Sequence, residues 1–208
     1  DGRRDDTPAL RRALAALRPG DTLRFGPGTF VHAARLVVAT PRVHLVADSA
    51  TLHATNPADQ ALLIQADGVV VRGFTLTAVT DRRRDAPWES RIAIWRDGTV
   101  APVSDVHILD NRIVEAGAPA TPLANSSSSA AIFVHPARRF TVARNVVRRS
   151  LADAIHVTGG STLGRVVGNT VRESGDDMVA IVSYLPTPRE QAQRAPTLVR
   201  DVLVADND

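Results

Sequence analysis

Two adjacent acids, Asp176 and Asp177, stand directly before the apolar run 178–182. A third acid, Asp153, precedes a shorter apolar run that contains His156. Carboxyl groups held close together cannot all stay ionised unless a proton, a cation or an arginine stabilises the group. A general acid beside a general base requires such an arrangement, so these four residues are the candidate catalytic set. Acids that precede a strand are also common turn residues, and a purely structural role is the alternative.

An internal repeat decides whether these acids meet. Four segments end in asparagine: VHILDN, FTVARN, GRVVGN and VLVADN, at 106–111, 140–145, 164–169 and 202–207. Asn145 and Asn169 are 24 residues apart, while the flanking gaps of 34 and 38 residues contain loop insertions expected at 115–129 and 184–197. A period of about two dozen residues, built from short strands and tight turns, predicts a parallel β-helix. Asparagine suits its stacked turns because it tolerates left-handed backbone and its amide can bond to the next coil.

The other elements agree with this architecture. Short runs rich in Val, Ile and Leu alternate with Gly, Asn, Asp and Pro along most of the chain, as in 22–25, 62–64 and 132–134. Residues 7–20 carry the one segment with helical spacing, with Thr7 as the expected cap. We expect this helix to cover the apolar end of the stack.

The repeat also sets the register of the acids. Eight residues separate Asn145 from Asp153, and eight separate Asn169 from Asp177. The two aspartates are therefore expected one above the other, with Asp176 beside them. Ile155 and Val157 then align with Val179 and Ile181 as inward residues, which places His156 on the outer face.

The same alignment extends to earlier coils. Matching 92–94 with 132–134 places Phe133 in the outward column of His156, with Trp95 and His135 in the column beside it. Aromatic, basic and acidic side chains on a flat sheet predict a carbohydrate groove. The expected substrate-binding residues are Glu89, Arg91, Trp95, Phe133 and His135.

Composition narrows the possible partners. The chain has no cysteine, and all 25 of its Lys+Arg residues are arginine, with a net charge of only +3. The short arginine clusters lack interleaved aromatic residues, so we expect no nucleic-acid partner. No stretch has the length of a membrane span, and the sequence predicts neither a metal nor a cofactor as a resident group.

The opening of the chain carries a family resemblance. DGRRDDTPALRRAL followed by PGDTLRFGPGTF resembles the start of the pectate-lyase-like right-handed β-helix superfamily, in which a short helix caps the first coil. The resemblance implies an all-β fold, a right-handed parallel β-helix with three strands per coil, in one domain over 1–208. It also implies a secreted or cell-surface bacterial protein, of which these residues are expected to be an N-terminal part.

A second resemblance concerns the acids. DAIHV followed by GDDMVAIVS resembles the catalytic coils of the polygalacturonase family of inverting glycoside hydrolases. It implies that Asp176 is the general acid and that Asp153 and Asp177 position the attacking water. Leu151 and Gly175 depart from the family pattern, and its Gly-His-Gly and Arg-Ile-Lys elements are missing, so pectin is not the expected substrate.

Three functions follow as expectations. The first is an inverting glycoside hydrolase that degrades a polysaccharide or oligosaccharide. The second is a uronate lyase or epimerase, in which Ca²⁺ or arginine neutralises a carboxylate, with Arg91 and His156 as candidates. The third is a non-catalytic stalk or sugar-binding surface, since this scaffold hosts many functions.

Overall fold

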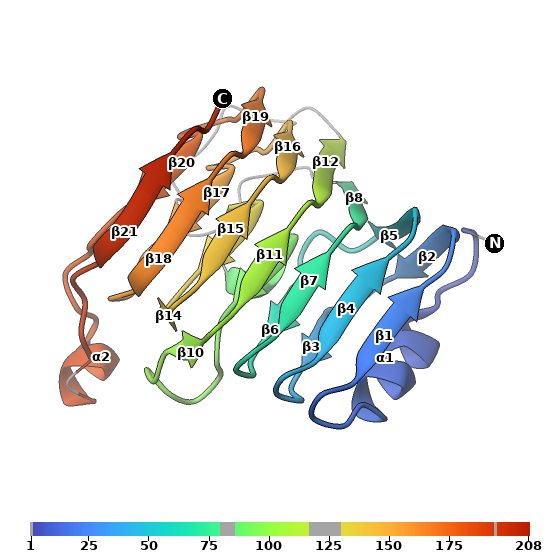
Figure 1. The fold of residues 1–208 in the computed structure, drawn as a ribbon, viewed down its shortest axis with the longest axis horizontal. Coiled ribbons are helices and arrows are strands. Elements are labelled where there is room, and N and C mark those ends of the chain that lie inside the picture. Colours follow the sequence, from blue (N-terminus) through green and yellow to red (C-terminus); the bar gives the residue numbers. More distant parts are fainter. Residues whose placement is uncertain (1, 80–85, 117–129, 194) are drawn as a thin grey trace.

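The computed structural model describes residues 2–79, 86–116, 130–193 and 195–208, which wind into a right-handed parallel β-helix (Figure 1). Successive coils lie side by side along the long axis of the molecule, from the blue N-terminal end to the red C-terminal end. Strands pair in parallel within three sheets, each of which receives one strand from most coils. The all-β, parallel β-helix prediction is therefore confirmed.

The three sheets are defined by their strands. The first contains β1 (Thr22–Phe25), β4 (His44–Ala47), β7 (Val70–Arg72), β10 (Val103–Ser104), β11 (His107–Leu109), β14 (Ala137–Arg138), β15 (Thr141–Ala143), β18 (Thr162–Val167) and β21 (Arg200–Ala205). The second contains β2 (Gly28–His32), β5 (Ala50–Ala54), β8 (Thr75–Val79), β12 (Arg112–Ala116), β16 (Val146–Arg148) and β19 (Thr170–Arg172). The third contains β3 (Leu36–Val38), β6 (Leu62–Ile64), β9 (Ile92–Ile94), β13 (Ile132–Val134), β17 (Ile155–Val157) and β20 (Val179–Ile181).

The core consists of columns of stacked aliphatic side chains. In-register pairing places like residues above one another, as in the first-sheet column Leu45, Val71, Ile108, Val142 and Val166. Each of these five is at most 1% exposed. Burying one such side chain contributes roughly 1.5–3 kcal/mol, so the repeat stabilises itself coil by coil.

Helix α1 (Thr7–Ala15) covers the N-terminal end of the stack, as expected, but it ends at Ala15 rather than at 20. Its buried residues Leu10 and Leu14 join the main core. Beyond the helix, the Leu17 amide bonds to Leu14 at 3.3 Å in a tighter turn, and Pro19 disfavours helical backbone before it. Thr7 is not the cap, because its hydroxyl instead accepts a 2.9 Å bond from the amide of Ala33.

The predicted asparagine ladder is present, and Asn111, Asn145 and Asn169 in it are buried. The side-chain amide of Asn111 donates to Asn145 Oδ1 at 3.1 Å, Asn145 to Asn169 at 3.0 Å, and Asn169 to Asn207 at 2.9 Å. The same oxygens also accept backbone amides of the preceding coil, each at 3.0 Å. The left-handed backbone falls on the residue before each asparagine, as at Asp110 with φ 55°, and not on the asparagine itself.

The second expected insertion, 184–197, forms a segment that we call the strap. It carries a short helix that the sequence did not predict, α2 (Pro188–Ala192), which projects beyond the starting end of β21 (Figure 1). Gly160 in the neighbouring coil has φ 73°, and a Cβ there would lie 1.9 Å from the carbonyl oxygen of Pro196. The strap therefore packs closely on that coil. Most of the other insertion, 117–129, lies outside the described residues.

A further short helix, η1 (Pro87–Glu89), precedes β9. Within the described parts of the chain, no helix is long and apolar enough to cross a membrane.

Candidate functional site

The three predicted acids meet where strands β17 and β20 begin. These strands pair with Ile155 opposite Val179, and the Ala154 amide bonds to the Asp177 carbonyl at 2.9 Å. The expected stacking of Asp153 and Asp177 is therefore present. One carboxylate oxygen from each of Asp153, Asp176 and Asp177 lies within 4.8 Å of the other two. We call this group the acidic corner.

Within the acidic corner, Asp153 is the buried member. It is 7% exposed, whereas Asp176 and Asp177 are exposed. One Asp153 oxygen accepts the backbone amide of Asp177 at 3.1 Å, and the other lies 2.5 Å from His156 Nδ1. Asp153 is thus fixed by two bonds from different coils, while Asp176 and Asp177 face solvent.

His156 lies under the strap. The side chain points to the outer face of the third sheet, as predicted, yet it is only 2% exposed. The ring of Tyr184 stacks on it at a centroid distance of 6.0 Å and an interplanar angle of 10°. On the other side, Phe133 lies 5.6 Å away. His156 can therefore orient Asp153 through Nδ1, but the stacked rings keep it from direct contact with a ligand in solvent.

A close backbone approach shapes the turn that presents the exposed acids. The Gly175 amide donates to the Ser150 carbonyl at 2.7 Å. A Cβ on Gly175 would lie 2.3 Å from the carbonyl oxygen of Leu151, so only glycine fits there. The two departures from the polygalacturonase pattern, Gly175 and Leu151, are thus contact partners in stacked turns of neighbouring coils.

The outer face of the third sheet does not form the expected open groove at its central residues. Phe133 is 5% exposed and packs with Leu63 and Ala93 in a second apolar cluster, against which Trp88 and Trp95 lie. Period-two alternation places these residues outside the coil, but other side chains then cover them. The prediction of an open groove along this strip was therefore wrong for its central residues.

Two further groove candidates are buried. Arg91 is 0% exposed, and its guanidinium bonds to the carbonyl oxygens of Gln60 and Leu52, the latter at 3.1 Å. Glu89 is 9% exposed, and its carboxylate accepts the Ala86 amide at 3.0 Å. Arg91 therefore cannot reach a substrate carboxylate at the surface, and Glu89 serves the turn at η1.

Trp95 and His135 are partly exposed, as a groove lining requires. They occupy the predicted neighbouring column and stack with ring centroids 4.7 Å apart. His135 Nε2 lies 3.5 Å from a carboxylate oxygen of Glu190 in α2. Burial lowers the pKa of His135 below its usual value, although Glu190 opposes the shift.

The sequence did not predict Glu190 and Tyr184 as site residues, because the strap lies outside the repeat on which the prediction of the site was based. Burial raises the pKa of Glu190, but hydrogen bonds from Thr187 and the contact with His135 outweigh it, so that pKa is lowered overall. The one available signal was Tyr184, the single tyrosine of the chain and the first residue of the predicted insertion.

Comparison with known proteins adds no family assignment. No protein-family model, curated protein or solved structure significantly matches this chain.

Proposed function

We propose that this chain is a glycoside hydrolase that cleaves a polysaccharide at the acidic corner. The convergence of Asp153, Asp176 and Asp177 from two neighbouring coils carries the proposal. Two of these acids are exposed to substrate, and the third is buried and held by His156. Glycoside hydrolysis needs two carboxyl groups with different roles, which such a split in environment supports.

The roles of Asp176 and Asp177 are those that the polygalacturonase resemblance implies, whereas the role of Asp153 follows from its burial. Asp176 is the general acid that protonates the leaving glycosidic oxygen. Asp177 is the carboxylate that assists attack at the anomeric carbon. Asp153 does not touch the sugar, because it is buried and bonded to the backbone amide of Asp177 at 3.1 Å. It is a positioning residue that fixes the turn and adds negative charge near the oxocarbenium-like transition state.

The spacing bears on the stereochemistry. Inverting enzymes separate their carboxyl groups by roughly 6.5–9.5 Å to admit water, whereas retaining enzymes hold them about 5–5.5 Å apart. The oxygens of the acidic corner lie within 4.8 Å. Because this figure joins only one selected oxygen of each carboxylate, it is compatible both with the inversion expected from the family resemblance and with retention, in which Asp177 attacks directly. The anomeric configuration of the first-formed product, followed by NMR, separates the two.

A cation-assisted lyase or epimerase is the second candidate, and the same distance favours it. Calcium binds oxygen ligands at roughly 2.3–2.6 Å, so ligands on one ion are at most about 5 Å apart. Asp153, Asp176 and Asp177 would hold the ion, which would supply charge neutralisation for a substrate carboxylate. Arg91 cannot supply it, since its side chain is buried.

One experiment tests both candidates. The protein is incubated with a polysaccharide panel, with and without calcium, and reducing ends and the ultraviolet absorbance of unsaturated sugars are recorded. Hydrolysis predicts reducing ends without absorbance, and their loss in Asp176→Asn. Absorbance that depends on calcium would replace the hydrolase proposal with the lyase, and an Asp176→Asn variant of full activity would remove the assigned general acid.

A further inference from the structure

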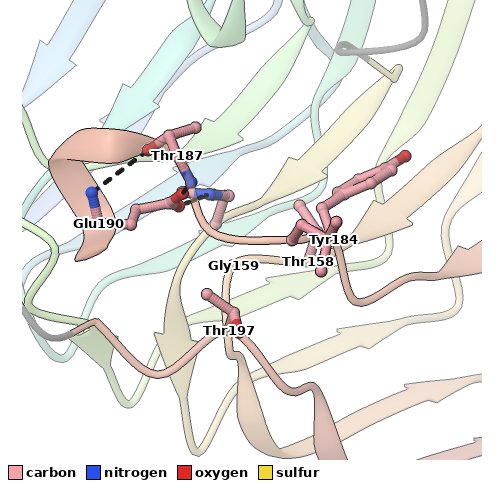
Figure 2. A pocket seen from close by; sticks show the side chains of 8 residues that line it. Thr158, Gly159, Tyr184, Thr187, Glu190 and Thr197 are labelled. Atoms are coloured by element: carbon pink, nitrogen blue, oxygen red, sulfur yellow. Dashed lines mark hydrogen bonds and ion pairs between the residues drawn. The ribbon is translucent and has the colours of Figure 1, made fainter.

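A pocket lies between the strap and the ends of the third-sheet strands, about five residues along the chain from Asp153. Its volume is about 190 Å³, far above the roughly 10–15 Å³ that a single water needs. Figure 2 shows the lining residues Thr158, Gly159, Tyr184, Thr187, Glu190 and Thr197. His135 contributes its ring to the same wall.

The pocket lies on the same face of the molecule as the acidic corner. Asp153 precedes β17 and Thr158 follows it, so the two ends are separated by roughly 16 Å of extended chain. Tyr184 connects them, because it lines the pocket and stacks on His156, which bonds to Asp153. An oligosaccharide that passes over Tyr184, which covers His156 of β17, would reach both places.

The lining suits a polyhydroxylated ring. Threonine hydroxyls both donate and accept hydrogen bonds, a carboxylate accepts two or more, and a tyrosine ring offers an apolar face. The pocket lining includes all three kinds of group, on Thr158, Thr197, Glu190 and Tyr184. The Tyr184 ring extends away from Glu190 and Thr187 (Figure 2). Such a set of a few polar groups with apolar walls is typical of small-ligand sites.

Charge selects among sugars. Glu190 is ionised at neutral pH, since its pKa lies below the usual value, while burial keeps its neighbour His135 uncharged. Among the described residues that line the pocket, the net charge is therefore negative. A sugar carboxylate placed here would meet a like charge, which disfavours binding.

We propose that this pocket is a subsite for a neutral sugar ring, so that the substrate is a neutral glycan and not a polyuronate. The inference rests on the proposed function for its choice of a saccharide ligand. The proposed preference for a neutral glycan comes from the strap, a segment outside the repeat frame, and distinguishes this chain from proteins that act on uronates.

The wall of the pocket is closely packed. A Cβ at Gly159 would lie 2.4 Å from the His135 ring, and one at Gly160 would lie 1.9 Å from the Pro196 oxygen. Both glycines have positive φ, 64° and 73°. Such packing favours a wall that is formed before a ligand binds, which reduces the ordering cost of binding.

Calorimetric titration of the Asp176→Asn variant tests the inference without turnover. The probes are neutral hexasaccharides of glucan, mannan, xylan and galactan, with hexagalacturonate as the acidic counterpart. We expect binding of at least one neutral hexamer and none of hexagalacturonate. Thr197→Phe fills the pocket and should weaken that binding at least about tenfold. Leu198→Phe adds bulk to the next residue, which is 70% exposed and outside the pocket, and should change it less than about twofold.

Three outcomes overturn the inference: hexagalacturonate binds more tightly, none of the neutral hexamers binds, or Thr197→Phe binds as well as Leu198→Phe. Because heat is measured on a variant that does not cleave, the outcome is independent of hydrolysis. Neutral-glycan binding without any cleavage by the native chain would refute the proposed function and leave the subsite standing.

Discussion

Replacing Asn145 by alanine is the sharpest perturbation of the coil stack. The side chain is 0% exposed. Its oxygen accepts two bonds from Asn111, at 3.0 and 3.1 Å, and its nitrogen donates to Asn169 at 3.0 Å and to the Ile108 carbonyl at 2.9 Å, with the Ala143 carbonyl sharing one of these hydrogens at 3.2 Å. Four lost bonds at roughly 1 kcal/mol each predict a loss of about 4 kcal/mol, with buried partners left unpaired as the main cost. That is a large share of a typical stability of roughly 5–15 kcal/mol.

Urea unfolding followed by circular dichroism measures this loss. Asn56→Ala is the matched control, because Asn56 lies in a turn and its oxygen accepts one bond, from the Ala58 amide at 3.1 Å, in an exposed setting. We expect the control to cost less than about 1 kcal/mol. If both variants unfold at the same urea concentration with equal slopes, the ladder does not stabilise the stack and the reasoning fails.

Three further predictions concern the strap, a buried histidine and the acidic corner. Gly160→Ala should release the strap and increase proteolytic cutting there. Gly98→Ala, with φ 77° and no atom within 4 Å of its added Cβ, is the control and should not increase the cutting. Equal cutting of the two variants would contradict the close packing of the strap. Burial lowers the pKa of His32 to about 3, below the ordinary value, so the folded state binds fewer protons than the unfolded chain and loses stability as pH falls from about 6.5 toward 3, by up to about 4 kcal/mol. Between pH 7 and pH 4, the urea midpoint of His32→Leu should fall by less than that of the native chain. An equal fall would mean that His32 does not cause the loss of stability in acid. His156→Phe keeps the ring stack but removes the Asp153 bond, and should lower the cleavage rate about 100-fold with the fold retained; an unchanged rate would deny His156 a positioning role.

The repeat predicted most of the fold because coil register is a local property of sequence. Stacked asparagines, the pairing of Ile155 with Val179, and the outward direction of His156 all follow from a fixed count along the chain. The meeting of Asp153 and Asp177 follows in the same way.

The repeat could not predict which side chains cover the outer faces of the sheets. Period-two alternation predicts the face of the sheet on which Phe133 and His156 lie. Their exposure depends on what packs on that face. Here Tyr184, which stacks on His156, belongs to an insertion that lies outside the repeat. Arg91 shows the same limit, since its position beside a strand gave no sign that its guanidinium would bond to buried carbonyl groups.

The central claim is that three acids from two coils act as one site, and combined substitution tests it most directly. On a polysaccharide that the native chain cleaves, kcat/KM is measured for Asp153→Asn, Asp176→Asn and Asp177→Asn, singly and together, with Asp48→Asn, an exposed aspartate paired with Arg24, as the control. A working unit predicts that the triple variant is little worse than the worst single variant, since effects within a unit are not additive. Single variants that all retain the activity of the control would contradict the account.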